Sequence, residues 1–370
     1  MKVALVHDYI KEYGGAERVL EALVEVFPDA PIYTTVYLPK YLGPHKNRFK
    51  NLDIKTSFLQ FLPFKAKLIS PIRLIAPTVF KTFDFKDFDA VIVSATGAYN
   101  PNMINKKKAV QICYCHTPPR YLYGFATARQ WKKNLLFRIL GETANHFLRM
   151  VDFDSSRNVD FFIANSINVS RRIEKFYRKN SSVIYPPVDL PKFDNTKKES
   201  YFLAGGRLAR PKHVDLIIKT CVKMGVPLKI FGKAFAGYGE ELKSIAGPNI
   251  EFLGEVADEE KIQLMKKAKA FIFASEDEDF GITPVEAMAV GTPVIAYASG
   301  GVLETVIEGK TGIFFDKLSE PSLSNAIKKL NKIKINGKDC RAQAEKFSKE
   351  RFMTGIKDFI NSKYKIQNYK

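Results

Sequence analysis

Short apolar runs alternate with helical patterns from one end of the chain to the other. This alternation is typical of parallel strands joined by crossover helices, because parallel neighbours cannot be connected by a tight hairpin. The runs form two successive series, and 370 residues exceed what one small core organises. We therefore expect an α/β fold with two doubly wound, Rossmann-like domains. The expected strands are Val3–His7, Pro31–Val36, Ala90–Ser94, Val110–His116 and Phe161–Asn165, then Tyr201–Ala204, Leu228–Phe231, Ile250–Leu253, Ala270–Ala274 and Pro293–Ala296.

The domain boundary is expected in a segment rich in proline and polar residues, Tyr185–Lys198. We place the N-terminal domain at residues 1–188 and the C-terminal domain at residues 199–346. Residues 347–370 have helical spacing with no strand after them, and we expect a helix that crosses back to the N-terminal domain.

Composition places the chain among ordinary globular proteins, with 46% apolar and 26% charged residues. No run approaches the ~18 apolar residues of a membrane span, and the first residues show a strand pattern without a signal-peptide cleavage region. The four cysteines, Cys113, Cys115, Cys221 and Cys340, show neither disulfide-framework nor Cys-x-x-Cys spacing. We therefore expect a cytoplasmic protein with reduced thiols.

Net charge is the unusual quantity, at +19. Nine basic residues and one acidic residue lie within Lys40–Phe83, where Pro63, Pro71 and Pro77 exclude one long helix. Short helices carrying aromatic, leucine and lysine side chains suit the interface of an anionic membrane. The alternative is that the apolar residues face the domain core and the lysines are solvated. We expect peripheral attachment to the inner face of the plasma membrane.

The same charge also suits a nucleic-acid-binding protein. Against that function, the chain shows no RNA-recognition signature, zinc-finger spacing or aromatic-glycine repeat. Its basic residues also gather beside apolar clusters and do not form a solvated stripe. We therefore expect no nucleic-acid partner.

The stretch from Glu278 to Glu286 places two carboxylates around a glycine and a helix start. Thr283 has the residue type of an N-cap, Pro284 suits the first helical position, and Glu286 lies three residues past the cap. Backbone amides from Gly281 onward then lie at the positive end of the helix, where they suit a phosphate, and the carboxylates suit sugar hydroxyls. The alternative is a capping box, in which Glu286 only bonds back to its own cap.

Three further groups of residues follow expected strands. Gly14 and Gly15 form a strand-to-helix turn at which backbone amides can approach a ligand closely. His116 lies just past a central strand, where open parallel sheets bind ligands. Arg207 and Lys212 follow a strand of the second series, and together they can clamp one pyrophosphate. The ordinary alternatives are a plain turn, a structural histidine and surface charge.

Two Asp-x-Asp pairs match a divalent-metal pattern, Asp152-Phe-Asp154 and Asp277-Glu-Asp279. Such pairs are frequent by chance, and neither has further ligand spacing. We therefore expect no metal-dependent chemistry.

Together these residues resemble the retaining glycosyltransferases of family 4, which have the two-domain GT-B fold. The Glu278-x7-Glu286 pair is similar to that family's paired-glutamate motif, and Arg207-x4-Lys212 is similar to its phosphate-binding pair. The resemblance covers nearly the whole chain, with the motifs in the family's order. The stretches similar to bacterial O-antigen-type mannosyltransferases that use GDP-mannose are His7-Asp-Tyr with Gly14-Gly-Ala-Glu-Arg18, Cys115-His-Thr-Pro-Pro-Arg-Tyr121 and Glu278-Asp-Phe-Gly-Ile-Thr-Pro-Val-Glu-Ala287.

For the second domain, the resemblance implies that the two glutamates bind different parts of a nucleotide-sugar donor. Glu278 would bond the hydroxyls of the donor sugar, helped by the amides of Phe280, Gly281 and Ile282. Glu286 would bond the ribose of the nucleotide.

The remaining roles implied by the resemblance concern the phosphates and the sugar. Arg207 and Lys212 would hold the diphosphate. Gly14 and Gly15 would pack against the donor phosphates from the other domain. His116 would touch the donor sugar at its 6-hydroxyl.

The resemblance thus implies two domains that face each other across a cleft and transfer a hexose to a lipid-linked or growing bacterial glycan. It implies mannose from GDP-mannose as the donor, retention at the anomeric carbon, no protein base, no metal and no cofactor besides the co-substrate. A UDP-hexose donor is the alternative within this class. Leu122–Ala128 departs from the acidic, tryptophan-containing segment of the similar enzymes, which leaves the acceptor open.

Overall fold

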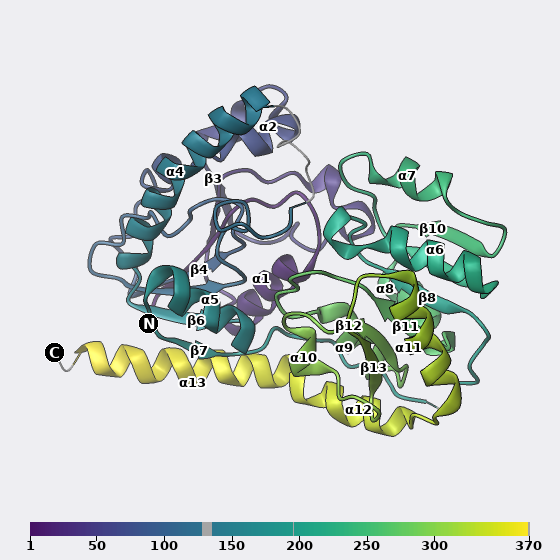
Figure 1. Ribbon diagram of the computed structural model, residues 1–370. Helices are drawn as coiled ribbons and strands as arrows, with labels where there is room; N and C mark the ends of the chain where they lie inside the picture. Colours follow the sequence, from purple (N-terminus) through teal and green to yellow (C-terminus); the bar gives the residue numbers. More distant parts are fainter. Residues whose placement is uncertain (128–134, 195, 369–370) are drawn as a thin grey trace. The chain divides into compact units, whose positions relative to one another are not determined.

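The computed structural model describes residues 1–127, 135–194 and 196–368, and the chain divides into two compact units (Figure 1). Unit 1 contains the described residues of 1–125, 130–187 and 350–370. Unit 2 contains those of 126–129 and 188–349. The segment 188–198, expected to be a linker, belongs to unit 2, where Val188 donates its amide to the carbonyl of Phe347 at 3.0 Å.

Unit 1 is built on a seven-stranded sheet in the order β3-β2-β1-β4-β5-β6-β7, and every pair of neighbours is parallel. The chain runs outward from β1 to β3, then returns to the centre at β4 and continues the other way. The strands are β1 (Val3–His7), β2 (Ile32–Thr34), β3 (Ile54–Thr56), β4 (Ala90–Ala95), β5 (Val110–Cys115), β6 (Phe161–Ala164) and β7 (Ser181–Val183).

Alternate residues of β1 belong to different apolar clusters, as expected for side chains that point to opposite faces of a sheet. Val3 and Leu5 pack with α1 (Gly15–Val26) and α13 (Lys349–Asn368). Ala4 and Val6 pack with α3 and α5. Helices therefore cover both faces, which explains why the strands read as continuous apolar runs. The other helices of this unit are α2 (Lys65–Ile72), α3 (Ala76–Phe80), α4 (Leu135–Arg157) and α5 (Ile167–Tyr177), with 3₁₀ turns at Pro39–Tyr41, Gly43–His45 and Phe58–Phe61.

Unit 2 is built on a six-stranded parallel sheet in the order β10-β9-β8-β11-β12-β13. An apolar cluster joins alternate strand residues such as Phe202 and Ala204 to α6, α7 and α11. Its strands are β8 (Phe202–Gly205), β9 (Leu228–Phe231), β10 (Ile250–Gly254), β11 (Ala270–Phe273), β12 (Val294–Tyr297) and β13 (Gly312–Phe315). Its helices are α6 (Val214–Met224), α7 (Tyr238–Ser244), α8 (Asp258–Lys267), α9 (Ile282–Ala289), α10 (Val302–Thr305), α11 (Glu320–Lys332) and α12 (Gly337–Ala344), with 3₁₀ turns at Arg210–Lys212 and Glu345–Phe347.

Each sheet has one point where the strand order reverses, between β1 and β4 in unit 1 and between β8 and β11 in unit 2. Ligands of open parallel sheets bind outside the carboxyl ends of the strands at this point. Two doubly wound domains were predicted, and the two sheets confirm that prediction.

The sequence patterns missed β3, β7 and β13, which all lie at sheet edges. β3 and β7 have three residues each and none of them is fully buried. β13 begins at Gly312, where an added Cβ would lie 2.2 Å from the carbonyl oxygen of Val294. Short or glycine-initiated strands carry too little apolar periodicity to be recognised. Among the described residues, no helix is long and apolar enough to cross a membrane.

Candidate functional site

The predicted residues of unit 2 gather at its reversal point. Arg207 and Lys212 lie on the loop after β8, and Glu278 lies on the loop after β11. A backbone hydrogen bond from Glu276 to the carbonyl of Pro211, 2.8 Å, ties the two loops together. Adjacent strands thus bring residues about seventy positions apart in sequence to one edge of the sheet.

Lys212 and Ser275 both contact the Glu278 carboxylate. Its Oε2 forms an ion pair with the Lys212 ammonium and accepts a hydrogen bond from the Ser275 hydroxyl at 2.6 Å. The Glu278 side chain is 14% exposed and that of Lys212 31%, so the pair is open enough for a ligand to reach. The Lys212 ammonium has three donors, so it can contact a phosphate while it neutralises Glu278.

The helix after Glu278 begins earlier than its sequence suggests. Gly281, with φ 90°, is the N-cap of α9, and Thr283 already lies inside the helix. The positive φ at this position favours glycine, which has no Cβ. Because the N-cap is Gly281 and not Thr283, the alternative of a capping box between Thr283 and Glu286 was wrong. The Phe280 ring is buried and packs edge-on against Phe347.

Glu286 forms an ion pair with Lys261 at 2.8 Å, and Lys261 also contacts Asp258 at 3.2 Å. The side chains of Glu286 and Lys261 are each 12% exposed. Lys261 was not predicted, because it belongs to α8, where a lysine has the residue type of an ordinary helix surface. A lysine thus faces each of the two glutamates.

A second glycine pair supports the loop that carries Glu278. An added Cβ on Gly300 would lie 2.2 Å from the Glu278 carbonyl oxygen, and one on Gly301 would lie 2.4 Å from that of Asp279. Gly301 also donates its amide to the Glu278 carbonyl at 2.8 Å. Only glycine permits this approach, so Gly300 and Gly301 fix the height of Glu278 above the sheet. The sequence analysis did not single out this glycine pair, although a Gly-Gly pair soon after a strand indicates a close backbone approach.

Arg207 also lies on the loop after β8. Its guanidinium carbon lies 5.2 Å from the centre of the Phe235 ring, on the loop after β9. The same β8 loop reaches α9, since an added Cβ on Gly206 would lie 3.7 Å from the Thr283 hydroxyl. The loop that carries Arg207 and Lys212 therefore lies beside the start of α9.

In unit 1, His116 lies at the end of a buried chain of polar groups. Its Nε2 lies 2.8 Å from the Ser94 hydroxyl, which lies 3.1 Å from Nδ1 of His7. His7 and Ser94 are direct partners across β1 and β4, and His116 follows β5. Glu17 of α1 completes the chain, with Oε1 3.7 Å from Nε2 of His7. All four side chains are buried.

We assign a direction to this chain. With the His7 proton assigned to Nε2, the nitrogen 3.7 Å from the Glu17 carboxylate, Nδ1 accepts from the Ser94 hydroxyl. The Ser94 oxygen then accepts from His116 Nε2–H, and Nδ1 of His116 is left as an acceptor. Burial, with a smaller contribution from His7, lowers the pKa of His116 to about 3. His116 is therefore a neutral acceptor near pH 7, which suits a donating hydroxyl group.

Gly14 and Gly15 are placed differently from one another. The Gly14 amide donates to Glu17 Oε2 at 2.9 Å, so it is already engaged. Gly15 is the exposed first residue of α1. First-turn amides have no acceptor within their helix, so the exposed Gly15 offers its amide more readily than Gly14 does.

The Asp-x-Asp pairs are not brought into a shared cluster with other ligands. Asp152 is buried and accepts from Tyr123 at 2.7 Å and Asn100 at 2.8 Å. Burial raises its pKa to about 7. Within residues 1–127, 135–194 and 196–368, no group of three or more His, Cys, Asp or Glu side chains is arranged to hold a metal ion.

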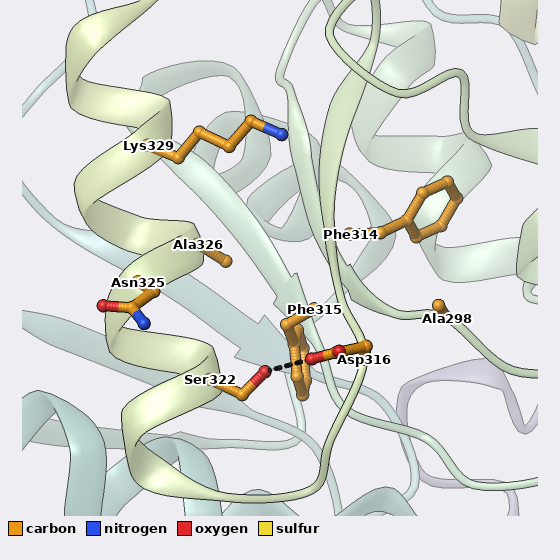
Figure 2. Close-up of a pocket in the computed structure, with 8 residues that line it drawn as sticks. All are labelled: Ala298, Phe314, Phe315, Asp316, Ser322, Asn325, Ala326 and Lys329. Atoms are coloured by element: carbon orange, nitrogen blue, oxygen red, sulfur yellow. Dashed lines mark hydrogen bonds between the residues drawn. The ribbon is translucent and has the colours of Figure 1, made fainter.

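Two cavities of unit 2 lie away from these residues. One, of about 250 Å³, lies beside β13, with Ser322 donating to Asp316 at 2.9 Å across its wall (Figure 2). The other, of about 370 Å³, is lined by residues such as Phe193, Lys198 and Lys269. Neither contains a predicted site residue, so the candidate site is defined by its loops and ion pairs.

Comparisons with known proteins agree with this geometry. The model of Glycosyltransferase Family 4 matches residues 13–192, and the model of Glycosyl transferases group 1 matches residues 188–347. The alpha-1,3/1,6-mannosyltransferase ALG2 of Mus musculus is 24% identical, covering 94% of this chain and 93% of the relative. ALG2 of Homo sapiens is 26% identical, covering 74% and 73%.

Solved structures of similar fold extend over the whole chain. Anabaena HepE in complex with UDP and glucose has a TM-score of 0.72 at 18% identity, covering 98% of this chain and all of that one. Sucrose-phosphate synthase from Thermosynechococcus elongatus has a TM-score of 0.75 at 17% identity, covering 99% of this chain and all of that one. With the two parallel sheets and the matched family models, the chain is a glycosyltransferase of the two-domain GT-B fold.

Proposed function

We propose that the protein transfers mannose from GDP-mannose, with retention at the anomeric carbon, to a lipid-linked or growing bacterial surface glycan. The mannose part is supported by the ALG2 relatives, which are alpha-1,3/1,6-mannosyltransferases. The resemblance of the His7, Cys115 and Glu278 stretches to O-antigen-type enzymes supports the donor and the glycan class.

The observation that carries the donor site is the pair of lysine–glutamate contacts around the start of α9. Glu278 with Lys212 and Glu286 with Lys261 place two oriented carboxylates at the carboxyl ends of the strands beside the reversal point. Carboxylates accept from hydroxyl groups, and a fixed lysine orients each carboxylate. Glu278 would bind the sugar hydroxyls and Glu286 the ribose.

The chemical step follows from where charge develops. Breaking the anomeric bond places positive character on the sugar and negative charge on the departing diphosphate. Lys212, Arg207 and the first amides of α9 would stabilise that negative charge from fixed positions, which is electrostatic catalysis. A phosphate oxygen of the leaving group would accept the proton of the acceptor hydroxyl, so no protein base and no metal ion is required.

His116 would contribute orientation to this step. Its Nδ1, the acceptor left by the Ser94 contact, would accept from the 6-hydroxyl of the donor sugar. Because the imidazole is neutral near pH 7, it would not compete with the lysines for the phosphates. We assign His116 to the sugar and Gly15 to a donor phosphate.

Slow donor hydrolysis without an acceptor tests the proposal. The purified protein is incubated with GDP-mannose, GDP-glucose, UDP-glucose and UDP-N-acetylglucosamine, and the release of nucleoside diphosphate is measured with and without a chelator. We expect release from GDP-mannose, unchanged by the chelator, with the released sugar first in the α configuration by NMR. Release from none of the four, or release abolished by the chelator, would contradict the proposal.

A UDP-hexose donor is the second candidate, because HepE was solved with UDP and glucose. Thermal-shift measurements separate the two, since a ligand that binds only the folded state raises the melting temperature. A larger shift with UDP than with GDP would favour the second candidate.

The acceptor side is proposed to lie at the cytoplasmic face of an anionic membrane. The basic, apolar region Lys40–Phe83 supports this partner, since aromatic and lysine side chains suit the interface. We propose no nucleic-acid partner.

A further inference from the structure

Helix α4 of unit 1 exposes apolar side chains and buries polar ones, which is opposite to an ordinary surface helix. Its apolar side chains Ile139, Leu140, Phe147 and Met150 are 55–60% exposed. Phe147 follows Ile139 by eight residues and Leu140 by seven, and Met150 follows Phe147 by three. These spacings place the four side chains on one side of the helix. The opposite side is buried and mostly polar, with Asn145, Leu148, Asp152, Ser155 and Ser156. Soluble helices show the reverse arrangement.

Hydrogen bonds fix this orientation. Asp152 accepts from Asn100 and from Tyr123, and Asn145 donates to the carbonyl of Tyr121 at 3.4 Å. Turning the helix to bury its apolar side would break these contacts and leave a carboxyl group in an apolar environment. These hydrogen bonds on the buried side therefore keep the apolar side of α4 facing outward.

A second exposed apolar stretch lies close to α4. Phe58, Phe61 and Phe64 are 58%, 86% and 77% exposed, and Leu74 and Ile75 are 58% and 48% exposed. Such large side chains rarely gather in the open on a monomer unless they contact a partner.

The two stretches are connected through Tyr121 and Leu122. The Arg73 guanidinium carbon lies 3.8 Å from the centre of the Tyr121 ring, and Arg149 of α4 donates to the Leu122 carbonyl at 3.1 Å. The segment between them thus joins both apolar stretches into one region of unit 1.

Charge identifies the partner. Residues 54–83 contain five basic residues, Lys55, Lys65, Lys67, Arg73 and Lys81, and no acidic residue. A second copy of the chain would bring like charges together, whereas anionic lipid is complementary to them. Lysine stems can also lie along apolar chains while the ammonium groups reach the headgroups.

We propose that the outward side of α4 and the Phe58–Ile75 stretch form one face that docks on an anionic lipid bilayer, with the phenylalanine rings inserted. This proposal deepens the membrane part of the proposed function and adds α4 to it. It extends the membrane contact from the basic region Lys40–Phe83 to α4, which lies outside that region in the sequence.

Co-sedimentation with vesicles tests it. The vesicles contain phosphatidylcholine alone or with phosphatidylglycerol, and the proteins are wild type, Phe61→Ser/Phe64→Ser, Phe147→Ser/Met150→Ser and the control Val222→Ser, which removes an exposed apolar residue of unit 2. We expect wild type and control to bind the anionic vesicles in low salt, and each double variant to bind at least tenfold more weakly. All four should melt alike, because the altered side chains are exposed.

Fluorescence gives an independent readout of insertion. The four native cysteines are buried, so Met150→Cys alone should react with an environment-sensitive fluorophore. Its emission should shift to the blue on anionic vesicles. No shift, or unchanged vesicle binding by the α4 double variant, would overturn the role of α4. Loss of a lipid-independent dimer in the variants would instead identify a second copy as the partner and would also overturn the proposal.

Donor hydrolysis without acceptor distinguishes a failure of the membrane proposal from a failure of the proposed function. The double variants should hydrolyse the donor as wild type does, since none of the altered residues lies at the donor site. Vesicle binding without any donor hydrolysis would leave the membrane proposal standing while the proposed function fails.

Discussion

The two units use the same position on the same kind of sheet for different electrostatic tasks. In unit 2, the residues at the reversal point form ion pairs that are partly exposed, Lys212 with Glu278 and Lys261 with Glu286. In unit 1, they form a buried chain of hydrogen-bonding groups that ends at His116. A charged, accessible site suits a diphosphate, whereas a dry, directional one suits a single hydroxyl group.

This contrast shows what the fold supplies and what it leaves to the side chains. Parallel strands bring residues distant in sequence to one edge, in both units. The side chains after each strand then determine whether that edge binds a charged group or accepts a hydrogen bond from a hydroxyl group. Variants that alter one site and not the other can break or sharpen the comparison.

The largest effect is expected from Glu278→Gln. Because the neutral amide cannot orient the sugar as the carboxylate does, transfer should fall on the order of 100-fold. The measurement is the rate of donor hydrolysis at saturating donor. The control is Glu276→Gln, on the same loop with a side chain 43% exposed, which should stay near wild type. Equal losses in both variants would show that the loop, and not the Glu278 carboxylate, is responsible.

Lys212→Ala and Arg207→Ala should each weaken nucleoside diphosphate binding about 10-fold to 100-fold, since hydrogen bonds to charged groups contribute ~1.5–3 kcal/mol. The affinity for the free nucleoside should hardly change. Isothermal titration calorimetry measures both ligands, with Lys219→Ala of α6 as a control whose side chain is 48% exposed. The diphosphate role fails if nucleoside and nucleoside diphosphate lose affinity equally.

Ser94→Ala tests the directional chain of unit 1 with a smaller expected effect. Without the hydroxyl, His116 loses the group that fixes its proton on Nε2. ¹⁵N NMR of labelled histidine should show one His116 tautomer in wild type and a mixture in Ser94→Ala, with donor hydrolysis lowered roughly tenfold. Ser155→Ala, whose buried hydroxyl bonds only within α4, should alter neither. A single unchanged tautomer in Ser94→Ala would refute the assignment.

The smallest effect concerns pH and stability. Because the pKa of His116 is about 3 in the folded protein and ~6.5 when unfolded, only the unfolded chain binds this proton between those values. Stability should therefore fall as pH is lowered from about 6.5 toward 3, by at most ~1.4 kcal/mol per pH unit for this group. Urea midpoints from pH 4 to 7 should slope less steeply in His116→Asn than in wild type. Equal slopes would mean that His116 is not buried in its neutral form.

The fold was predictable because its strands are buried on both faces. Runs such as Val3–His7 and Ala270–Phe273 are apolar at every or nearly every position, and turn residues follow them. The edge strand Ile54–Thr56 was not predictable, since its alternation is too short to separate from a loop. The start of α9 was misplaced by two residues, because Thr283 and Pro284 match the residue types of a helix start. The helix in fact begins after Gly281, whose positive φ marks it as the N-cap.

The site was predictable only in part. Residues that follow strands, such as Glu278 and His116, stand out by position in the sequence. Lys261, the partner of Glu286, and Ser94, the partner of His116, do not stand out, because one lies on a helix and the other inside a buried strand. Contacts between elements are set by tertiary packing, and one sequence without its structure carries no signal for them.

Calorimetric binding of GDP-mannose, GDP and guanosine to wild type, Glu278→Gln and Glu286→Gln tests the central claim most directly. If Glu278 reads the sugar and Glu286 the nucleotide, Glu278→Gln should weaken only GDP-mannose, and Glu286→Gln should weaken all three ligands by a similar factor. Weakening of guanosine by Glu278→Gln, or of GDP-mannose alone by Glu286→Gln, would contradict the division of roles between the two glutamates.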